Sequence, residues 1–355
     1  MALRVNGDIW LFDCGEATQH QFQKSQLKMG RITKIFITHM HGDHCFGLGP
    51  LLCSTGTNTG GDSADPSYAC PPLEIYGPSR LRQWLRTTMK STYTTLERTY
   101  RVHEILFPDD PEDANEQLYS QELPGENLRL TSTNDLPLAV QLDIGAGFKV
   151  TATPIKHSIP SIGFVIQEPD ILGTIDIAAI RPVLLRNADA LLAQGIKQPL
   201  SLLGKLQRSG QPIDLPDGTR IEPPSKVPGR QVVILGDTCD PSNIASFCSQ
   251  PQLLVHEATN ALTSMDAGSV TEELVEERCI AHGHSTPQMA GAFAKRLGAH
   301  TLILTHFSSR YKGDESPESL SVMEEVRQLA LGTFGQDKDK HLHCARDFYE
   351  FQIKL

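Results

Sequence analysis

The chain has 355 residues, an apolar fraction of 39 % and a formal net charge of −10 at neutral pH. This length permits one large α/β domain or two smaller ones, and we expect one. The eight cysteines show no C-x-x-C spacing, and no stretch is long and apolar enough for a membrane span or an export signal. We therefore expect reduced thiols, no membrane contact and a cytoplasmic or nuclear location.

The charges are unevenly distributed along the chain. Residues 104 to 127 contain eight acids and no Lys or Arg, whereas residues 80 to 101 contain six basic residues and one acid, Glu97. A net negative charge disfavours a polyanionic partner, but only a locally positive face is needed to hold phosphates. The basic residues of the predicted helix are interpreted either as RNA contacts or as a hydrated helix face: Arg80, Arg82, Arg86 and Lys90.

The first predicted strands lead to a cluster of metal-binding residue types. A buried strand at Ile9 to Phe12 ends at Asp13, and a second strand, residues 32 to 38, ends at His39-Met40-His41-Gly42-Asp43-His44. Imidazole nitrogens and carboxylate oxygens suit zinc, manganese or iron, and glycine permits a sharp turn between the ligands. This pattern predicts a metal loop, with Asp13 as a hydrogen-bond acceptor that supports a metal-bound imidazole.

Later segments repeat the pattern of an apolar strand followed by a polar residue. They place four side chains at strand ends: His157, Asp237, Glu257 and His306. A lone histidine is more often structural than a ligand, but the strand-end position makes His157 a candidate ligand. His256 is expected to point into the core. His284 follows Gly283 directly before a predicted helix start.

The segments around these residues together resemble the ribonuclease Z family of the metallo-β-lactamase superfamily. The matching stretches are residues 10–19, 38–52, 256–259, 282–286 and 304–311, and they occur in order over nearly the whole chain. The resemblance implies a four-layer αβ/βα sandwich formed by a single domain, 1–355, with a protruding exosite-like arm inserted at 167–230. It also implies a zinc-dependent endoribonuclease that removes the 3′ trailer from precursor tRNA and acts as a homodimer.

The resemblance further implies a role for each site residue. One zinc ion would be held by His39, His41 and His157, a second by Asp43, His44 and His306, and Asp237 would bridge the two. Asp43 would also orient the attacking water, and His284, oriented by Glu257, would be the acid. Ser308, Arg310 and Tyr311 would contact the substrate, although Arg310 could instead pair with a carboxylate.

Two features depart from the family pattern. The strand with a Gly-Thr-Gly turn that precedes the equivalent of Ile9 to Phe12 is not found, and no Gly-Pro tip is legible near Lys197-Gln198-Pro199. These departures leave two alternatives: another hydrolase of this fold that acts on small molecules, or a catalytically impaired RNA-binding or scaffold form. The His284 and Glu257 pair and the long arm disfavour the first alternative, and the complete ligand set disfavours the second.

Overall fold

The computed structural model describes residues 1–56, 70–112, 118–133, 135–266, 268–335 and 340–353. These residues form two compact units, which we describe separately. The first comprises Met1–Ile144, Lys149–Ile166 and Gln231–Leu355, and the second comprises Gly145–Phe148 and Gln167–Arg230. Among the described residues, no helix has the length and apolarity required to cross a bilayer.

The first sheet of the first unit follows the order β1-β2-β3-β4-β5-β6, with β7 also beside β5. β1 is antiparallel to β2, and the pairs from β2 to β6 are parallel. The strands are β1 Ala2–Val5, β2 Asp8–Phe12, β3 Ile32–Phe36, β4 Leu73–Pro78, β5 Tyr100–Leu106, β6 Glu122–Leu123 and β7 Asn127–Arg129. Among the described residues, β1 forms one edge of this sheet.

The second sheet follows the order β18-β17-β16-β15-β10-β9-β8. Its strands β15 to β18 are parallel neighbours, so their carboxyl ends meet at one edge of the sheet. The strands are β8 Val140–Asp143, β9 Lys149–Ile155, β10 Ser161–Gln167, β15 Gln231–Ile234, β16 Leu253–Glu257, β17 Thr301–Thr305 and β18 His341–Cys344.

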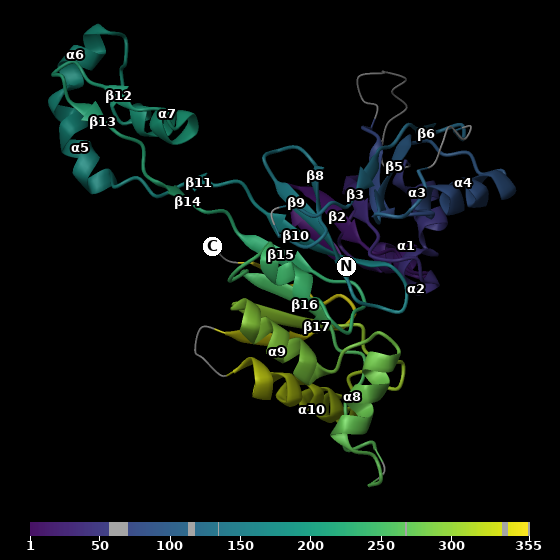
Figure 1. The fold of residues 1–355 in the computed structure, drawn as a ribbon. Coiled ribbons are helices and arrows are strands. Elements are labelled where there is room, and N and C mark those ends of the chain that lie inside the picture. Colours follow the sequence, from purple (N-terminus) through teal and green to yellow (C-terminus); the bar gives the residue numbers. More distant parts are fainter. Residues whose placement is uncertain (57–69, 113–117, 134, 267, 336–339, 354–355) are drawn as a thin grey trace. The chain divides into compact units, whose positions relative to one another are not determined.

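Helices cover the outer faces of the two sheets, which pack against each other (Figure 1). Leu51 of α3 and Leu85 of α4 share a core with the first sheet, whereas α9 and α10 pack on the second. Phe164 contacts the rings of Phe12 and Phe36 at 5.8 and 5.3 Å between centroids, which joins the sheets. The helices are α1 Thr18–Lys24, α2 Gly42–Cys45, α3 Leu48–Thr55, α4 Leu81–Ser91, α8 Glu272–Ala281, α9 Pro287–Leu297 and α10 Pro317–Phe334, with 3₁₀ helices at Met29–Arg31 and Ser242–Ser246. The predicted four layers are confirmed.

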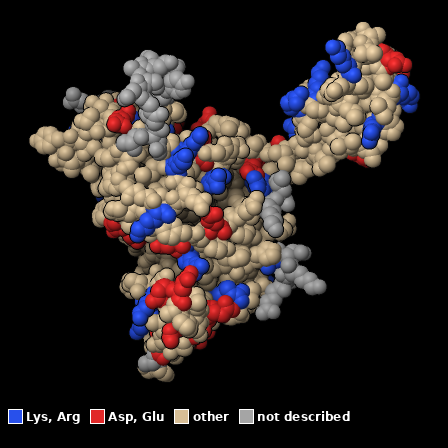
Figure 2. All heavy atoms as spheres, turned by 180° about the vertical axis from the view of Figure 1, so that it is seen from behind, with Lys and Arg blue, Asp and Glu red and all other residues tan. Residues whose placement is uncertain are grey.

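The second unit has a small core of its own. Its buried leucines include Leu184 of α5, Leu191 of α6 and Leu202 of α7. The helices are α5 Ile177–Arg186, α6 Ala188–Ala193 and α7 Ser201–Ser209, and two short antiparallel pairs accompany them: β11 Ile171–Leu172 with β14 Lys226–Val227, and β12 Ile213–Asp214 with β13 Arg220–Ile221. Lys and Arg outnumber Asp and Glu on the face of this unit drawn in Figure 2. Its role as an exosite-like arm stays a prediction.

Two basic residues of α4 are buried, which agrees neither with the predicted RNA contacts nor with the predicted hydrated helix face. Arg82 and Arg86 are only 6 % and 3 % exposed. Arg86 donates two hydrogen bonds to the buried Glu122 at 2.8 and 2.7 Å, and Arg82 lies beside the buried Glu104. These arginines are neither RNA contacts nor a hydrated face, because the acids of the following segment neutralise them inside the protein.

Candidate metal centre

The metal loop follows β3 and turns back on itself at the short helix α2. His39 is fully buried, and its Nε2 lies 3.0 Å from Nδ1 of His41. The helix begins at Gly42. It places the ring of His44 4.0 Å from the ring of His39 between centroids, and Nε2 of His44 lies 3.5 Å from Oδ2 of Asp43. The loop thus concentrates four donor side chains at the end of a single strand.

The second sheet brings three further donors to the same place. His157 follows β9 and places its Nε2 3.2 Å from Nδ1 of His41. Asp237 follows β15, and its Oδ2 lies 3.2 Å from Nε2 of His306, the residue after β17, and 3.5 Å from Nε2 of His44. Three overlapping groups of converging donor atoms result: His39, His41, His157 and Asp237; Asp43, His44 and His306; and Asp237, His284 and His306. Asp237 is shared by the first and third groups, and His306 is shared by the second and third.

The geometry of these donors fits zinc. Four ligands at about 2.0–2.1 Å in a tetrahedral arrangement lie about 3.3–3.5 Å from one another, close to the separations around Asp237. Nε2 of His44 is buried and has no hydrogen-bond partner among the described residues, an arrangement that costs free energy unless a cation accepts its lone pair. The donor set therefore suits two divalent cations.

Hydrogen bonds behind the donors fix the orientation of the imidazole rings. Nδ1 of His44 lies 2.8 Å from Oδ2 of Asp13, Nδ1 of His157 lies 2.7 Å from the carbonyl of Gly283, and Nδ1 of His306 lies 3.0 Å from Oγ1 of Thr259. Each bond leaves Nε2 directed at the centre, as metal-bound histidines require. The supporting position predicted for Asp13 is confirmed by its bond to His44.

Two of the site residues have an unusual backbone conformation. Asp13 has φ +58° and His306 has φ +55°, in the left-handed region that side chains other than glycine rarely adopt. Asp13 accepts hydrogen bonds from the backbone N–H and the hydroxyl of Thr38 at 2.7 and 2.9 Å, which hold it there. Such strain is typical of residues whose position serves a site.

The electrostatic field of the centre favours positive charge. Burial lowers the pKa of His39 to about 3, so this ring is neutral and free to bind a metal ion. At His44, burial is outweighed by the hydrogen bond to Asp13 and by the nearby carboxylate of Asp237, which raise its pKa to about 10. Burial also opposes ionisation of Asp237, but the neighbouring His44 and His306 hold its pKa well below the usual range. The carboxylate of Asp237 therefore stays ionised and attracts cations.

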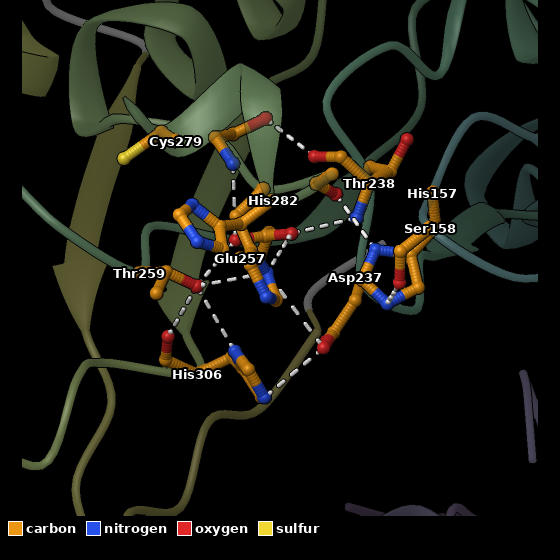
Figure 3. Close-up of polar contacts among 12 residues, drawn as sticks. His157, Ser158, Asp237, Thr238, Glu257, Thr259, Cys279, His282 and His306 are labelled. Atoms are coloured by element: carbon orange, nitrogen blue, oxygen red, sulfur yellow. Dashed lines mark hydrogen bonds and ion pairs between the residues drawn. The ribbon is translucent and has the colours of Figure 1, made fainter. Parts of the chain in front are cut away.

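His284 and Glu257 form a pair beside this centre. Nδ1 of His284 lies 3.1 Å from Oε1 of Glu257, which is 1 % exposed. Glu257 also accepts the backbone N–H group of Thr238 at 2.6 Å (Figure 3) and that of Ser285 at 3.1 Å. The bond with Glu257 raises the pKa of His284. The pair thus presents a histidine that is held in place and favours its protonated form.

The residues predicted to bind substrate have partners within the protein. Arg310 pairs with Asp266 at 2.8 Å, the alternative that the sequence left open. Tyr311 is 9 % exposed, and its hydroxyl accepts the backbone N–H of Ala261 at 3.0 Å. Ser308 is half-buried and donates its backbone N–H to Thr259. Contact of Ser308, Arg310 and Tyr311 with a substrate stays a prediction.

Sequence reasoning missed Thr259 as a member of the site. Its Oγ1 donates to Glu257 and lies 3.3 Å from Nδ1 of His284 and 3.0 Å from Nδ1 of His306 (Figure 3). It therefore connects the His284 and Glu257 pair with a predicted metal ligand. The available signal was its position two residues after Glu257, at the end of β16. His256, by contrast, is buried as expected.

Known proteins resemble this chain over most of its length. The family model described as anti-Pycsar protein Apyc1 matches residues 1–106. The zinc phosphodiesterase ELAC protein 1 of Bos taurus is 39 % identical over 329 residues, covering 88 % of this chain and 82 % of the relative. Ribonuclease Z of Bacillus licheniformis is 31 % identical over 362 residues, covering 99 % and 91 %.

A solved structure confirms the fold. The crystal structure of human tRNase Z, short form, matches with a TM-score of 0.60 and 31 % identity, and the match covers 100 % of this chain and 92 % of that one. The identity and coverage of these relatives agree with the layered fold. The chain therefore belongs to the ribonuclease Z family.

Proposed function

We propose that this protein is a zinc-dependent endoribonuclease that removes the 3′ trailer from precursor tRNA. The supporting observation is the convergence of seven metal-binding side chains from two sheets beside the hydrogen-bonded His284 and Glu257 pair. Relatives named zinc phosphodiesterase, ribonuclease Z and tRNase Z support the same activity. The donor cluster accounts for hydrolysis, and the named relatives indicate that the bond hydrolysed is an RNA phosphodiester.

We assign the donors to two zinc ions. His39, His41 and His157 would hold one ion, Asp43, His44 and His306 the other, and Asp237 would bridge them. When bound, the two ions supply positive charge to the phosphate and lower the pKa of a water at the site. The protein's own contribution is to fix the donors through the bonds to Asp13, Gly283 and Thr259.

Two residues of the chain would move the protons of the reaction. The side chain of Asp43 is 59 % exposed and lies 3.5 Å from Nε2 of His44, so it can reach water and accept a proton from the attacking molecule. His284, oriented by Glu257, would donate a proton to the departing 3′-oxygen. The products would be a tRNA with a 3′-hydroxyl and a trailer with a 5′-phosphate.

The second unit would contact tRNA away from the cut. It carries exposed basic side chains at Arg181, Lys197, Lys205 and Arg208, and cations of this kind bind the nucleic-acid backbone. Replacing Lys205 and Arg208 by alanine should raise KM for precursor tRNA and weaken its salt dependence while kcat changes little. We also propose that the protein acts as a homodimer, which the mass of the purified protein in solution would test.

Cleavage of a 3′-extended precursor tRNA tests the proposal. The zinc-loaded protein should release the trailer with the ends given above, and Asp43→Ala and His284→Ala should each lower kcat by about 10²–10⁴-fold. Asp109→Ala, which changes an exposed aspartate of the first unit, should keep full activity. A zinc-loaded protein that leaves precursor tRNA intact, or that instead hydrolyses small thioesters or lactones, would contradict the proposal.

A further inference from the structure

Phe46 is a large apolar side chain exposed next to the metal loop. It is 56 % exposed, although burial of such a ring would be favourable by itself. Its ring lies against Gly42, where an added Cβ atom would meet the ring at 2.3 Å. Gly42 joins His41 to Asp43, so the ring lies on the backbone between the predicted ligands of the two ions.

A second aromatic side chain supports the ring from α4. Trp84 stacks on Phe46 with 6.2 Å between the ring centroids and 22° between the ring planes, and it also packs against the core of the first sheet. The orientation of the Phe46 ring is therefore fixed from two sides, by Gly42 and by Trp84, while over half of its surface remains open to solvent. Fixed, solvent-exposed aromatic rings serve as stacking surfaces for nucleic-acid bases.

The chemistry of the proposed reaction indicates which base would reach Phe46. The attacking water and the departing 3′-oxygen lie on opposite sides of the phosphorus in an in-line displacement. His284 would donate a proton to the 3′-oxygen and would therefore lie beside the nucleotide upstream of the cut. Asp43 would accept a proton from the water on the opposite side. The first trailer nucleotide stays attached to the phosphate, and Phe46 lies three residues after Asp43 in the chain.

We propose that Phe46, supported by Trp84, stacks on the base of the first trailer nucleotide and so positions the scissile phosphate. This inference rests on the proposed function and names a substrate contact for it. Stacking is tolerant of base identity because every base has a π-face, so the contact would hold trailers of different sequence. The competing role, packing that only stabilises the metal loop, predicts a different pattern of kinetic effects.

Precursor tRNAs that lack single bases separate the two roles. Phe46→Leu keeps apolar bulk but removes the ring, and it should lower kcat/KM on the intact substrate about 10-fold, within the range of one lost stacked base. On a substrate whose first trailer nucleotide is abasic, wild type and Phe46→Leu should be equally active. On a substrate that is abasic just upstream of the cut, the 10-fold loss should persist. Phe46→Tyr should restore activity.

Two controls complete the experiment. Zinc content of Phe46→Leu should equal that of the wild type, and Tyr93→Leu, which alters a side chain that is 90 % exposed, should leave kcat/KM unchanged. An equal loss on the intact and the trailer-abasic substrates, a loss of zinc, or no loss on the intact substrate would overturn the stacking role. Failure of the wild type to cleave the intact substrate would instead overturn the proposed function, and the stacking role with it.

Discussion

Asp13 lies behind the candidate metal centre and is not one of its converging donors. Its carboxylate links the backbone of the β3 end, through Thr38, to the imidazole of His44. Without this bond the ring of His44 loses both its orientation and the support of a negative charge. Outer hydrogen bonds of this kind typically change metal affinity by 10–100-fold.

We therefore expect Asp13→Asn to lower zinc affinity by about 10–100-fold. Competition with a chelator of known affinity measures this loss directly. Asp109→Asn, the same change at an exposed position, should have no effect. Unaltered zinc affinity of Asp13→Asn would show that the bond to His44 has no role in holding the metal.

The contribution of the Asp266 and Arg310 pair to the stability of the fold depends on pH. The hydrogen bond from Arg310 holds the pKa of Asp266 below its ordinary value of 3.8. A carboxyl whose pKa is lower in the folded than in the unfolded state stabilises the fold above the unfolded value, and the contribution is lost as pH falls through the folded value. The stabilisation is therefore present at neutral pH and absent in strong acid.

Asp266→Asn should lower the free energy of unfolding by about 0.5–1 kcal/mol at pH 6. The difference from the wild type should begin to shrink as the pH falls below the ordinary value of 3.8, and it should vanish once the pH lies below the lowered pKa of the folded-state carboxyl, because the wild-type carboxyl is then protonated. Urea unfolding at a series of pH values measures this. A difference that stays constant over the series would mean that the pair contributes through packing and not through charge.

The sequence predicted which side chains would lie close together where these are adjacent in the chain or end a strand. His39, His41, Asp43 and His44 fall within six residues, so a single turn brings them together. Thr259 could not be distinguished from an ordinary loop threonine, because its bonds to Glu257 and His306 exist only after β16 and β17 have paired. Arg310 and its partner Asp266 are 44 residues apart, so the sequence alone did not identify them as a pair.

At the scale of elements, α4 is held to the first sheet by buried ion pairs as well as by apolar contacts. Arg86 and Glu122 are 3 % and 5 % exposed, and two hydrogen bonds join them. The sequence indicated a basic helix but not its acidic partner, which lies 36 residues away in the acidic segment 104 to 127. Composition alone therefore misassigned Arg82 and Arg86 to the surface.

Removing one member of this pair should be strongly destabilising. We expect Arg86→Met to lower the free energy of unfolding by about 3–5 kcal/mol, because the buried carboxylate of Glu122 then keeps, among the described residues, only the backbone N–H of Tyr119 and has lost its cationic partner. Arg86→Met combined with Glu122→Leu should recover most of the loss. Denaturant unfolding measures the free energy of unfolding of both variants. Arg278→Met, on the exposed face of α8, is the control and should change this free energy by close to zero. A single variant as stable as the wild type would contradict the burial of this pair.

At the scale of the whole first unit, the metal centre joins the two sheets. His39, His41 and His44 follow a strand of the first sheet, whereas His157, Asp237 and His306 follow strands of the second. Ions bound by both sets, as proposed, would hold the sheets together, and ligands that bind only the folded state stabilise it by mass action. The proposal therefore couples metal binding to folding.

Removal of metal should lower the melting temperature of the protein. Free zinc at about 1,000 times its Kd contributes about 4 kcal/mol, and a chelator withdraws this contribution, so Tm should fall by several degrees and recover when zinc is added back. Differential scanning calorimetry with and without chelator measures the shift. Asp237→Asn should show a much smaller shift, and equal shifts in variant and wild type would assign the effect to metal bound elsewhere.

The number of zinc ions per chain is the most direct test of the arrangement of donors described here. Native mass spectrometry of the purified protein should find two zinc ions per chain in the wild type. It should find a lower occupancy in variants that lose a donor from either set, such as His157→Ala or His306→Ala. A correctly folded wild-type chain that binds no zinc, or binds it unchanged in both variants, would contradict the assignment of these side chains to a two-ion centre.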